Sequence, residues 1–265
     1  MLPTPSTSHV PYARVYEPAE DSFLLLDTLS SPSETAFLAS HFPLTSPTPS
    51  PLVLEIGPGS GVVLAFLTAH AHAFFSRRDI LTLGIDINRF ACQATGETVR
   101  KAVAEDAAGA ATGANAKGGY GYFLAAAQGD LTSPVRPRTV DVLVFNPPYV
   151  PTPEVPSLPI GMTEEKTTYE EDSALLALSY AGGKDGMEIT DRLIGELPVV
   201  LSDRGVAYLL LCAQNKPEEV KERVRRVMAR RGGTGVWRAE TVGTSGRQAG
   251  WEKLQIVRIW QEEHV

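Results

Sequence analysis

The tetrapeptide Asn146-Pro147-Pro148-Tyr149 directly follows a run of strand-forming residues. Proline cannot donate a hydrogen bond to a sheet and fixes its own φ, so Pro147 and Pro148 should end the strand. Asn146 would then lie at the carboxyl end of a strand, where open α/β sheets bind their ligands. We therefore expect Asn146 to face a ligand.

This tetrapeptide suits the activation of a planar nitrogen. An amide or aromatic amine nitrogen is a weak nucleophile because its lone pair is delocalised into a π-system. The side-chain carbonyl of Asn146 and the backbone carbonyl of Pro147 could both accept from the NH2 hydrogens and localise that lone pair. Tyr149 would lie against the planar group, although an ordinary buried turn aromatic is the alternative. The pattern predicts Asn146, Pro147 and Tyr149 as catalytic residues, and these three with Pro148 as substrate contacts.

A glycine turn follows the first strand-like run, with Gly57, Gly59 and Gly61 at alternate positions. Glycines let the backbone turn tightly and approach a ligand closely, although many such turns serve packing alone. The spacing is shorter than that of the dinucleotide-binding fingerprint. Glu55 precedes the turn, and a carboxylate there would repel a pyrophosphate but attract a sulfonium or amino group. The sequence predicts a cationic cofactor.

Two further acids follow strand-like runs. Asp86 ends the second run, where an acid binds ribose hydroxyls in nucleoside-binding sheets, although a helix cap is the alternative. Asp130 ends the third run, where it could accept from an exocyclic adenine amine while Leu131 packs on the ring. Because three acids each follow a strand, we predict an adenosyl cofactor.

These residues depend on an alternation of strands and helices along the chain. Apolar runs typical of strands are predicted at residues 52–56, 80–85, 120–127, 140–145, 206–211 and 253–260. Helical patterns are predicted at residues 61–75, 89–104, 173–180, 186–201 and 217–231. This alternation predicts a doubly wound α/β fold with a mostly parallel sheet.

Length and composition favour one globular domain over residues 1–265, with a hydrophobic content of 43%. We expect an N-terminal helical segment at residues 16–42 and a loop insertion near residues 104–119. The formal net charge of -7 argues against a surface that binds phosphate backbones. Neither cysteines nor histidines have the spacing of a metal site. No apolar run could span a bilayer and no signal peptide is evident, so we expect a cytosolic or nuclear address.

Taken together, the motifs resemble a known family. Glycine turn, ribose acid, adenine acid and "NPPY" occur in the order of the class I S-adenosylmethionine-dependent methyltransferases that act on planar nitrogens. Within these, "NPPYVPTPE" and "VYEPAEDSFLLLDTL" (Val15 to Leu29) are similar to the HemK-like glutamine methyltransferases. The similarity is strongest to the eukaryotic and archaeal branch that modifies a release factor at its Gly-Gly-Gln motif. It runs from about Tyr16 to the C-terminus, and "AGGKDGMEITDRL" fits it as well.

The resemblance implies a seven-stranded Rossmann-like sheet with S-adenosyl-L-methionine as cofactor. It implies that the helix start near residues 16–27 lies over the cofactor, with Ser22 as a hydrogen-bonding contact and Tyr16 nearby. Helix capping explains much of the same segment, because Pro18 and the acids Glu20 and Asp21 suit a first turn. The reaction implied is N5-methylation of a glutamine in a translation release factor.

Three other functions stay open on the residues alone. "NPPY" is shared with adenine and cytosine amino methyltransferases, so a nucleic-acid methyltransferase acting on adenine N6 is the nearest alternative. The acidic charge balance and the lack of a separate recognition domain disfavour it. A lysine methyltransferase would need deprotonation of its substrate more than an asparagine clamp. A non-catalytic protein that keeps the fold is disfavoured by the intact motifs.

The third predicted strand indicates a partner protein. In a doubly wound methyltransferase sheet this strand lies at an edge, and no charge or proline occurs between Tyr120 and Gln128. Tyr120, Tyr122, Phe123 and Leu124 would expose apolar side chains there. The resembled branch works with a small zinc-binding activator subunit, which could add a strand to this edge at residues 120–127. The alternative is that the Ala-Gly-rich insertion or the N-terminal tail covers the edge.

Overall fold

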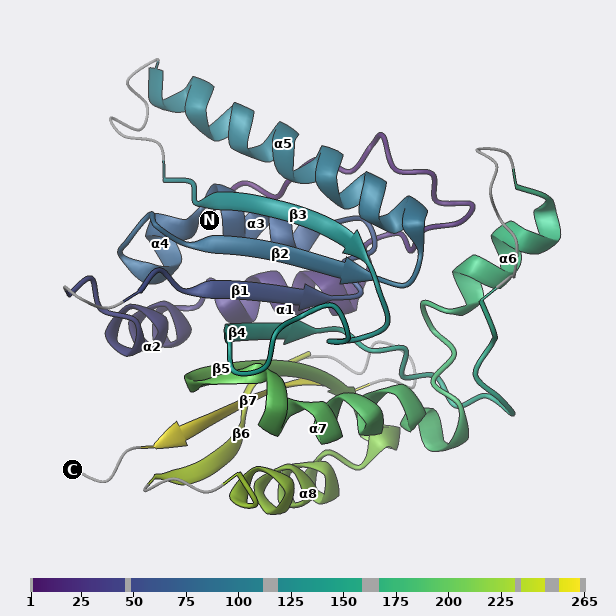
Figure 1. Cartoon of the computed structure of the whole chain (residues 1–265). Helices are drawn as coiled ribbons and strands as arrows, with labels where there is room; N and C mark the ends of the chain where they lie inside the picture. Colours follow the sequence, from purple (N-terminus) through teal and green to yellow (C-terminus); the bar gives the residue numbers. More distant parts are fainter. Residues whose placement is uncertain are drawn as a thin grey trace.

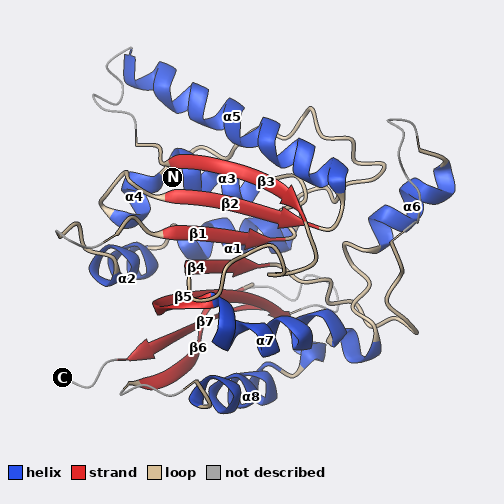
Figure 2. Ribbon diagram, viewed as in Figure 1, coloured by secondary structure: helices blue, strands red, loops and turns tan. Residues whose placement is uncertain are grey.

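Seven strands form one twisted sheet with helices on both faces (Figures 1 and 2). The computed structural model describes residues 2–45, 49–111, 119–158, 167–231, 235–245 and 253–262. The strand order is β3-β2-β1-β4-β5-β7-β6. The strands are β1 (Leu52–Ile56), β2 (Leu81–Asp86), β3 (Tyr122–Gln128), β4 (Val140–Phe145), β5 (Leu201–Cys212), β6 (Val236–Thr244) and β7 (Leu254–Glu262).

The pairing confirms a doubly wound, mostly parallel, seven-stranded sheet. Strands β3, β2, β1, β4 and β5 pair in parallel, whereas β7 is antiparallel to both β5 and β6. The first strand of the chain, β1, lies in the middle of the sheet. Strands β2 and β3 follow on one side of it, and β4 then pairs with its other side. This reversal between β1 and β4 opens a crevice at the carboxyl ends of the strands, where ligands bind in such folds.

Eight α-helices are described. They are α1 (Glu20–Leu29), α2 (Pro32–His41), α3 (Val62–Ala69), α4 (Ala71–Phe75), α5 (Arg89–Ala111), α6 (Tyr169–Ala177), α7 (Glu188–Val200) and α8 (Pro217–Ala229). Short 3-10 turns occupy η1 (Lys184–Gly186) and η2 (Ala213–Asn215). No helix in the described ranges is long and apolar enough to cross a membrane.

The two faces of the sheet carry separate apolar cores. Alternate side chains of the strands point to opposite faces, so Val53 packs with α1 to α4 while Leu54 packs with α7 and α8. Helix α5 packs against α3 and β3 on the first face. Helix α6 belongs to neither layer and lies beyond the carboxyl ends of the strands (Figure 1).

Several predicted elements differ from the observed ones. Strand β6 was not predicted, because its buried residues are few and charged side chains alternate with them at Arg238 and Glu240. Helix α6 begins earlier than predicted, at Tyr169, because Thr168 and Glu171 form a capping box. The predicted helix 61–75 is broken at His70, which ends α3 and precedes α4.

The two segments predicted as loops also differ in part. Helix α5 continues to Ala111, so the insertion predicted near residues 104–119 begins as helix. Residues 112–118, and residues 46–48 in the loop after α2, lie outside the described residues. The predicted helical segment 16–42 contains α1 and α2, which separate at Ser30 and Ser31.

Candidate active site

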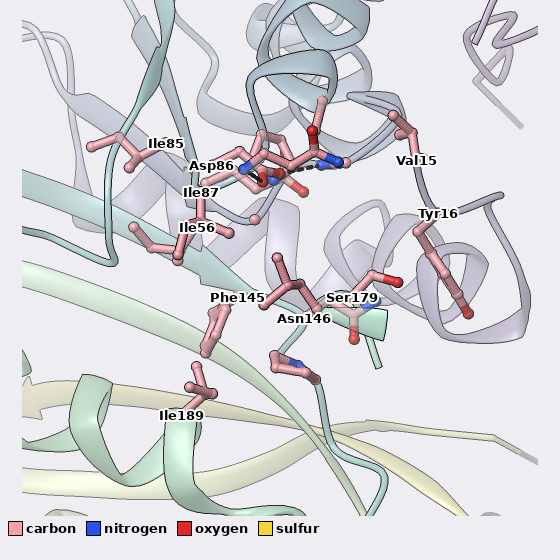
Figure 3. Close-up of a pocket in the computed structure, with 18 of the residues that line it drawn as sticks. Val15, Tyr16, Ile56, Ile85, Asp86, Ile87, Phe145, Asn146, Ser179 and Ile189 are labelled. Atoms are coloured by element: carbon pink, nitrogen blue, oxygen red, sulfur yellow. Dashed lines mark hydrogen bonds between the residues drawn. The ribbon is translucent and has the colours of Figure 1, made fainter. Parts of the chain in front are cut away.

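A cavity of about 230 Å³ opens at the carboxyl ends of β1, β2 and β4 (Figure 3). The loops after these strands form most of its wall, and the N-terminal segment before α1 and the α6 region close it. The predicted residues that line it are Tyr16, Ser22, Glu55, Gly57, Gly59, Asp86, Asp130, Leu131, Asn146 and Pro148. Gly61, Pro147 and Tyr149 are not part of its wall.

The glycine turn lies at the floor of this cavity. Gly57 and Gly59 have φ values of 61° and 54°, in the region that favours glycine. Gly61 also has a positive φ, of 79°, but a Cβ there would lie 2.6 Å from the Cα of Thr95. The close packing of α3 against α5 therefore explains Gly61, whereas Gly57 and Gly59 keep side chains out of the cavity.

Glu55 is a buried carboxyl group with an open acceptor. Its side chain is 3% exposed, and its Oε2 has no hydrogen-bond partner. Burial raises the pKa of Glu55 to about 8; the Leu64 backbone N–H offsets part of this rise, and the nearby Asp86 carboxylate adds to it. A positive charge in the cavity would stabilise the ionised form of Glu55.

Backbone donors hold Asp86 at the cavity, whereas Asn88 caps α5 by accepting from the Phe90 backbone N–H. Asp86 lines the cavity, and its Oδ1 accepts from the Asn88 backbone N–H at 2.8 Å just before α5. Its Oδ2 accepts from the Gly59 backbone N–H at 3.1 Å, which ties the end of β2 to the glycine turn. Burial raises the pKa of Asp86 to about 6, and these backbone donors oppose the rise.

Asp130 and Leu131 lie on the side of the cavity formed after β3. Asp130 forms an ion pair with Arg192 of α7, with 2.6 Å between Nη2 and Oδ2, and both side chains are about half exposed. Leu131 is buried with a φ of 47°, a conformation that is strained for a residue with a branched side chain. The ion pair with Arg192 was not predicted, because nothing in the sequence relates residues of β3 and α7.

Asn146 lines the cavity and has one unpaired polar atom. Its Nδ2 donates to Oδ2 of Asp21 at 2.9 Å, while its Oδ1 is buried without a hydrogen-bond partner. Pro147 is buried behind it, and Pro148 lines the cavity. Tyr149 is partly buried and packs against the core of the first face, so the structure does not bring its side chain into the cavity wall.

A second glycine-rich segment supports the backbone of this tetrapeptide. A Cβ at Gly182 would lie 2.4 Å from the carbonyl oxygen of Pro148, and one at Gly186 would lie 2.0 Å from that of Tyr149. The buried Asn215 donates to the Tyr149 carbonyl at 3.4 Å and to the Asp185 carbonyl at 3.2 Å. The sequence carried a signal for this support in "AGGKDG", but its contact with the tetrapeptide was not foreseen.

The start of α1 closes the cavity above Asn146. Tyr16 donates from its hydroxyl to Oδ2 of Asp21 at 3.1 Å. The Ser22 hydroxyl donates to Oδ1 of Asp21 at 3.2 Å, and Ser22 itself lines the cavity. Tyr16 and Ser22, which the resemblance places near the cofactor, both line the cavity. Asp21 joins them to Asn146 through hydrogen bonds.

Helix α6 and its flanks supply wall residues that sequence reasoning missed. Leu175, Leu178 and Ser179 line the cavity, and Leu175 packs on Val15 in a small apolar cluster. Arg14 pairs with Asp172 of α6, with 3.2 Å between Nε and Oδ1. These contacts tie α6 to the N-terminal segment across the mouth of the cavity.

The residues fit an adenosyl cofactor with a positive charge. The orphaned Oε2 of Glu55 offers an acceptor to a cation, and the turn at Gly57 and Gly59 leaves room for a ligand against the backbone. Apolar walls at Ile87 (Figure 3) and at Leu131 suit a flat heterocycle. Within the described residues no group of His, Cys, Asp or Glu could hold a metal ion.

Comparison with known proteins gives full-length relatives. The eRF1 methyltransferase catalytic subunit mtq2 of Schizosaccharomyces pombe is 32% identical over 98% of this chain and 96% of its own. Methyltransferase HEMK2 of Mus musculus is 34% identical over 97% of this chain and 96% of its own. A release factor glutamine methyltransferase of Moorella thermoacetica is 32% identical over 39% of this chain and 33% of its own.

Structural comparison gives more distant similarity. The Methanocaldococcus jannaschii TYW2 structure in complex with AdoMet has a TM-score of 0.49 and 10% identity. The match covers 97% of this chain and 81% of that chain. No protein-family profile matches the sequence.

Proposed function

The chain belongs to the HemK-like methyltransferases, and from that premise we propose that it methylates N5 of the glutamine in the Gly-Gly-Gln motif of a translation release factor. Its cofactor is S-adenosyl-L-methionine. The observation that carries the substrate proposal is the Oδ1 atom of Asn146, which is buried at the end of β4 with no partner. A neutral acceptor in that position suits an amide NH2 group.

The residues of the chain divide into two groups by their chemistry. Glu55 and Asp86 offer carboxylates to the cofactor, with the turn at Gly57 and Gly59 between them. S-adenosylmethionine supplies, when bound, a methyl group on a positively charged sulfur. Asn146 accepts a hydrogen bond from the substrate amide, and the Pro147 carbonyl is the second candidate acceptor, so the nitrogen lone pair is localised and directed. Asn146 remains neutral throughout and transfers no proton, so the proton that the substrate NH2 group loses on methylation is released to water.

The names of the relatives support the substrate class. The yeast relative is an eRF1 methyltransferase catalytic subunit, and the bacterial relative is a release factor glutamine methyltransferase. Because a release factor acts in translation, we propose a cytosolic address for the chain.

The test is mass spectrometry of a release factor after incubation with the enzyme and S-adenosylmethionine. We expect a gain of one methyl group on the Gly-Gly-Gln glutamine. Replacing that glutamine with glutamate should abolish the reaction, because a carboxylate has no nitrogen to methylate and would face the Asn146 carbonyl unfavourably. Methylation of DNA oligonucleotides under matched conditions, without modification of the release factor, would instead favour the nucleic-acid alternative.

We further propose that the free edge of β3 binds the small zinc-binding activator subunit implied by the family resemblance. The strand order places β3 at the edge, and Tyr122 and Leu124 are 61% and 53% exposed. The yeast relative is named a catalytic subunit, which agrees with a heterodimer. Added strand pairing would cover both the apolar side chains and the free backbone groups of this edge.

The structure corrects one of the four residues that we expected to be exposed at this edge. Phe123 packs inward, against the cluster between α3, α5 and β3, whereas Tyr122 and Leu124 point outward. Leu124→Asp should therefore abolish co-purification with the activator, and Val199→Asp, at an exposed position on α7, should not. We expect the chain alone to be poorly soluble or weakly active. A soluble, fully active monomer, with the activator bound equally by both variants, would contradict this proposal.

A further inference from the structure

Asp21 connects the start of α1 to the residue that faces the substrate. The carboxyl group is 3% exposed and receives four hydrogen bonds. Two reach Oδ2, from Asn146 Nδ2 at 2.9 Å and from the Tyr16 hydroxyl at 3.1 Å. Two reach Oδ1, from the Ser22 backbone N–H at 2.6 Å and from the Ser22 hydroxyl at 3.2 Å. In all four bonds the Asp21 oxygens act as acceptors.

From this geometry we propose that Asp21 is a positioning residue, whose carboxylate holds the Asn146 amide so that its carbonyl, and not its NH2 group, faces the substrate. The inference rests on the proposed function, because the substrate nitrogen is assumed to carry hydrogens. It adds to that function a residue that acts on the substrate only indirectly, through Asn146.

The orientation follows from donor and acceptor chemistry. The two ends of an asparagine amide are nearly equal in size, so shape alone fixes its rotation poorly. A carboxylate can only accept, so the end of Asn146 that faces Asp21 must be the NH2 group. The reverse rotation would set Oδ1 against a carboxylate oxygen and would aim an N–H donor at the substrate's own NH2 group. That rotamer could not localise the nitrogen lone pair.

Helix capping does not account for these contacts. An acid in the first turn is favoured by the helix dipole at an exposed site, and the exposed neighbour Glu20 meets that description. Asp21 is instead buried and bonded to a residue 125 positions later in the chain. A buried carboxylate is costly unless several donors satisfy it, so its place beside Asn146 calls for a functional explanation.

The decisive variant is Asp21→Asn, which keeps the shape but can present either a donor or an acceptor to Asn146. We expect kcat to fall about 10-fold to 10²-fold, the range seen when a supporting hydrogen-bond partner is removed. The KM for the release factor and the Kd for S-adenosylmethionine should stay within about threefold. Asp27→Asn, on the exposed side of the same helix, is the matched control and should retain full activity.

A double-mutant cycle separates positioning from general destabilisation. If Asp21 acts through Asn146, then Asp21→Asn should cause no further loss of kcat in an Asn146→Ala background. An equal loss in both backgrounds would overturn the proposal, as would full activity of Asp21→Asn in the wild-type background.

A measurement without substrate keeps this test independent of the proposed function. In 15N-labelled wild-type protein, the side-chain NH2 signal of Asn146, assigned by its loss in Asn146→Ala, should exchange with solvent about 10-fold or more slowly than a free asparagine amide. Asp21→Asn should shift this signal and speed its exchange, and Asp27→Asn should not. Rapid exchange in the wild-type protein would refute the positioning role even if the variant fails to fold. If the signal exchanges slowly and depends on Asp21 but the release factor stays unmodified, the result would contradict the proposed function and leave the positioning role of Asp21 intact.

Discussion

Two buried glutamates of this protein have the same side chain and nearly the same exposure, yet opposite surroundings. Glu34 of α2 is 2% exposed, and both its oxygens are bonded by the Arg258 guanidinium at 2.8 and 3.0 Å. The buried Tyr208 hydroxyl donates to the same carboxylate at 2.8 Å. Glu55 of β1 is 3% exposed, and its Oε2 has no partner.

The difference separates structural support from ligand binding. Glu34 fixes α2 onto strands β5 and β7, and the Arg258 guanidinium also stacks between Phe37 and Trp260. Both oxygens of the Glu34 carboxylate are thus engaged by protein donors, and neither is left unpaired for a ligand. Burial favours the protonated form of Glu55, and a bound cation would favour its ionised form, which is the arrangement expected at a functional site.

The largest expected effect lies in the structural cluster. Glu34→Ala should lower the free energy of unfolding by about 3–5 kcal/mol, because it leaves the Arg258 charge buried without its partner. Chemical denaturation at pH 7 measures this. Glu55→Gln, at matched burial, should instead raise the same quantity, because folding at pH 7 no longer has to protonate a buried carboxyl whose pKa is raised to about 8. Equal losses in the two variants would break the comparison.

The next largest effect is a loss of catalytic rate with no loss of protein stability. Asn146→Ala should reduce kcat by at least ~10²-fold, because the acceptor that localises the nitrogen lone pair is removed. The Kd for S-adenosylmethionine, measured by calorimetry, and the thermal unfolding temperature should change little. A parallel loss of cofactor affinity would show that Asn146 serves mainly to bind the cofactor.

Asp86→Ala should show the opposite division. Its carboxylate accepts from Gly59 and Asn88, and its removal also frees the glycine turn. We expect the Kd for S-adenosylmethionine to rise by about 10-fold to 10²-fold, the scale of a lost hydrogen bond to a charged group. At saturating cofactor, kcat should recover most of its wild-type value. Failure to recover would place Asp86 in the chemical step.

The sequence predicted the fold and the ends of its strands better than the pairing of its side chains. Alternating apolar runs and the acids that follow them are local features, so Glu55, Asp86 and Asn146 could be assigned to one edge of the sheet. Strand β6 was not predicted from the sequence because only Trp237 and Ala239 are buried along it. Its identity as a strand depends on pairing with β7, which no local pattern encodes.

Contacts between distant segments account for the other differences. The packing of Gly61 on Thr95, the ion pair of Asp130 with Arg192, and the bond from Asn146 to Asp21 each join separate elements. Residue types at these positions allowed several roles, and only the tertiary structure selects one. At the β3 edge, exposure was expected for Tyr120, Tyr122, Phe123 and Leu124; it is observed for all but Phe123, which the alternation of side chains along the strand turns toward α3 and α5.

The smallest expected effect is a dependence of cofactor affinity on pH. Because burial raises the pKa of Glu55 to about 8, this side chain is mostly protonated at pH 7 in the ligand-free protein. A cationic ligand prefers the carboxylate, so binding must release a proton, and affinity must rise as pH rises toward 8. The ionised fraction grows from about one in eleven at pH 7 to about one half at pH 8, so the Kd should fall about fivefold. The ligand-free fold should show the converse trend: a raised pKa means that the folded state binds the extra proton, so stability falls as pH rises from 4.5 to 8. Calorimetric titration at the two pH values checks the prediction, with Glu55→Gln as the control that should remove the dependence. A Kd that is constant between pH 7 and 8 in the wild-type protein would show that Glu55 does not meet the cofactor's positive charge.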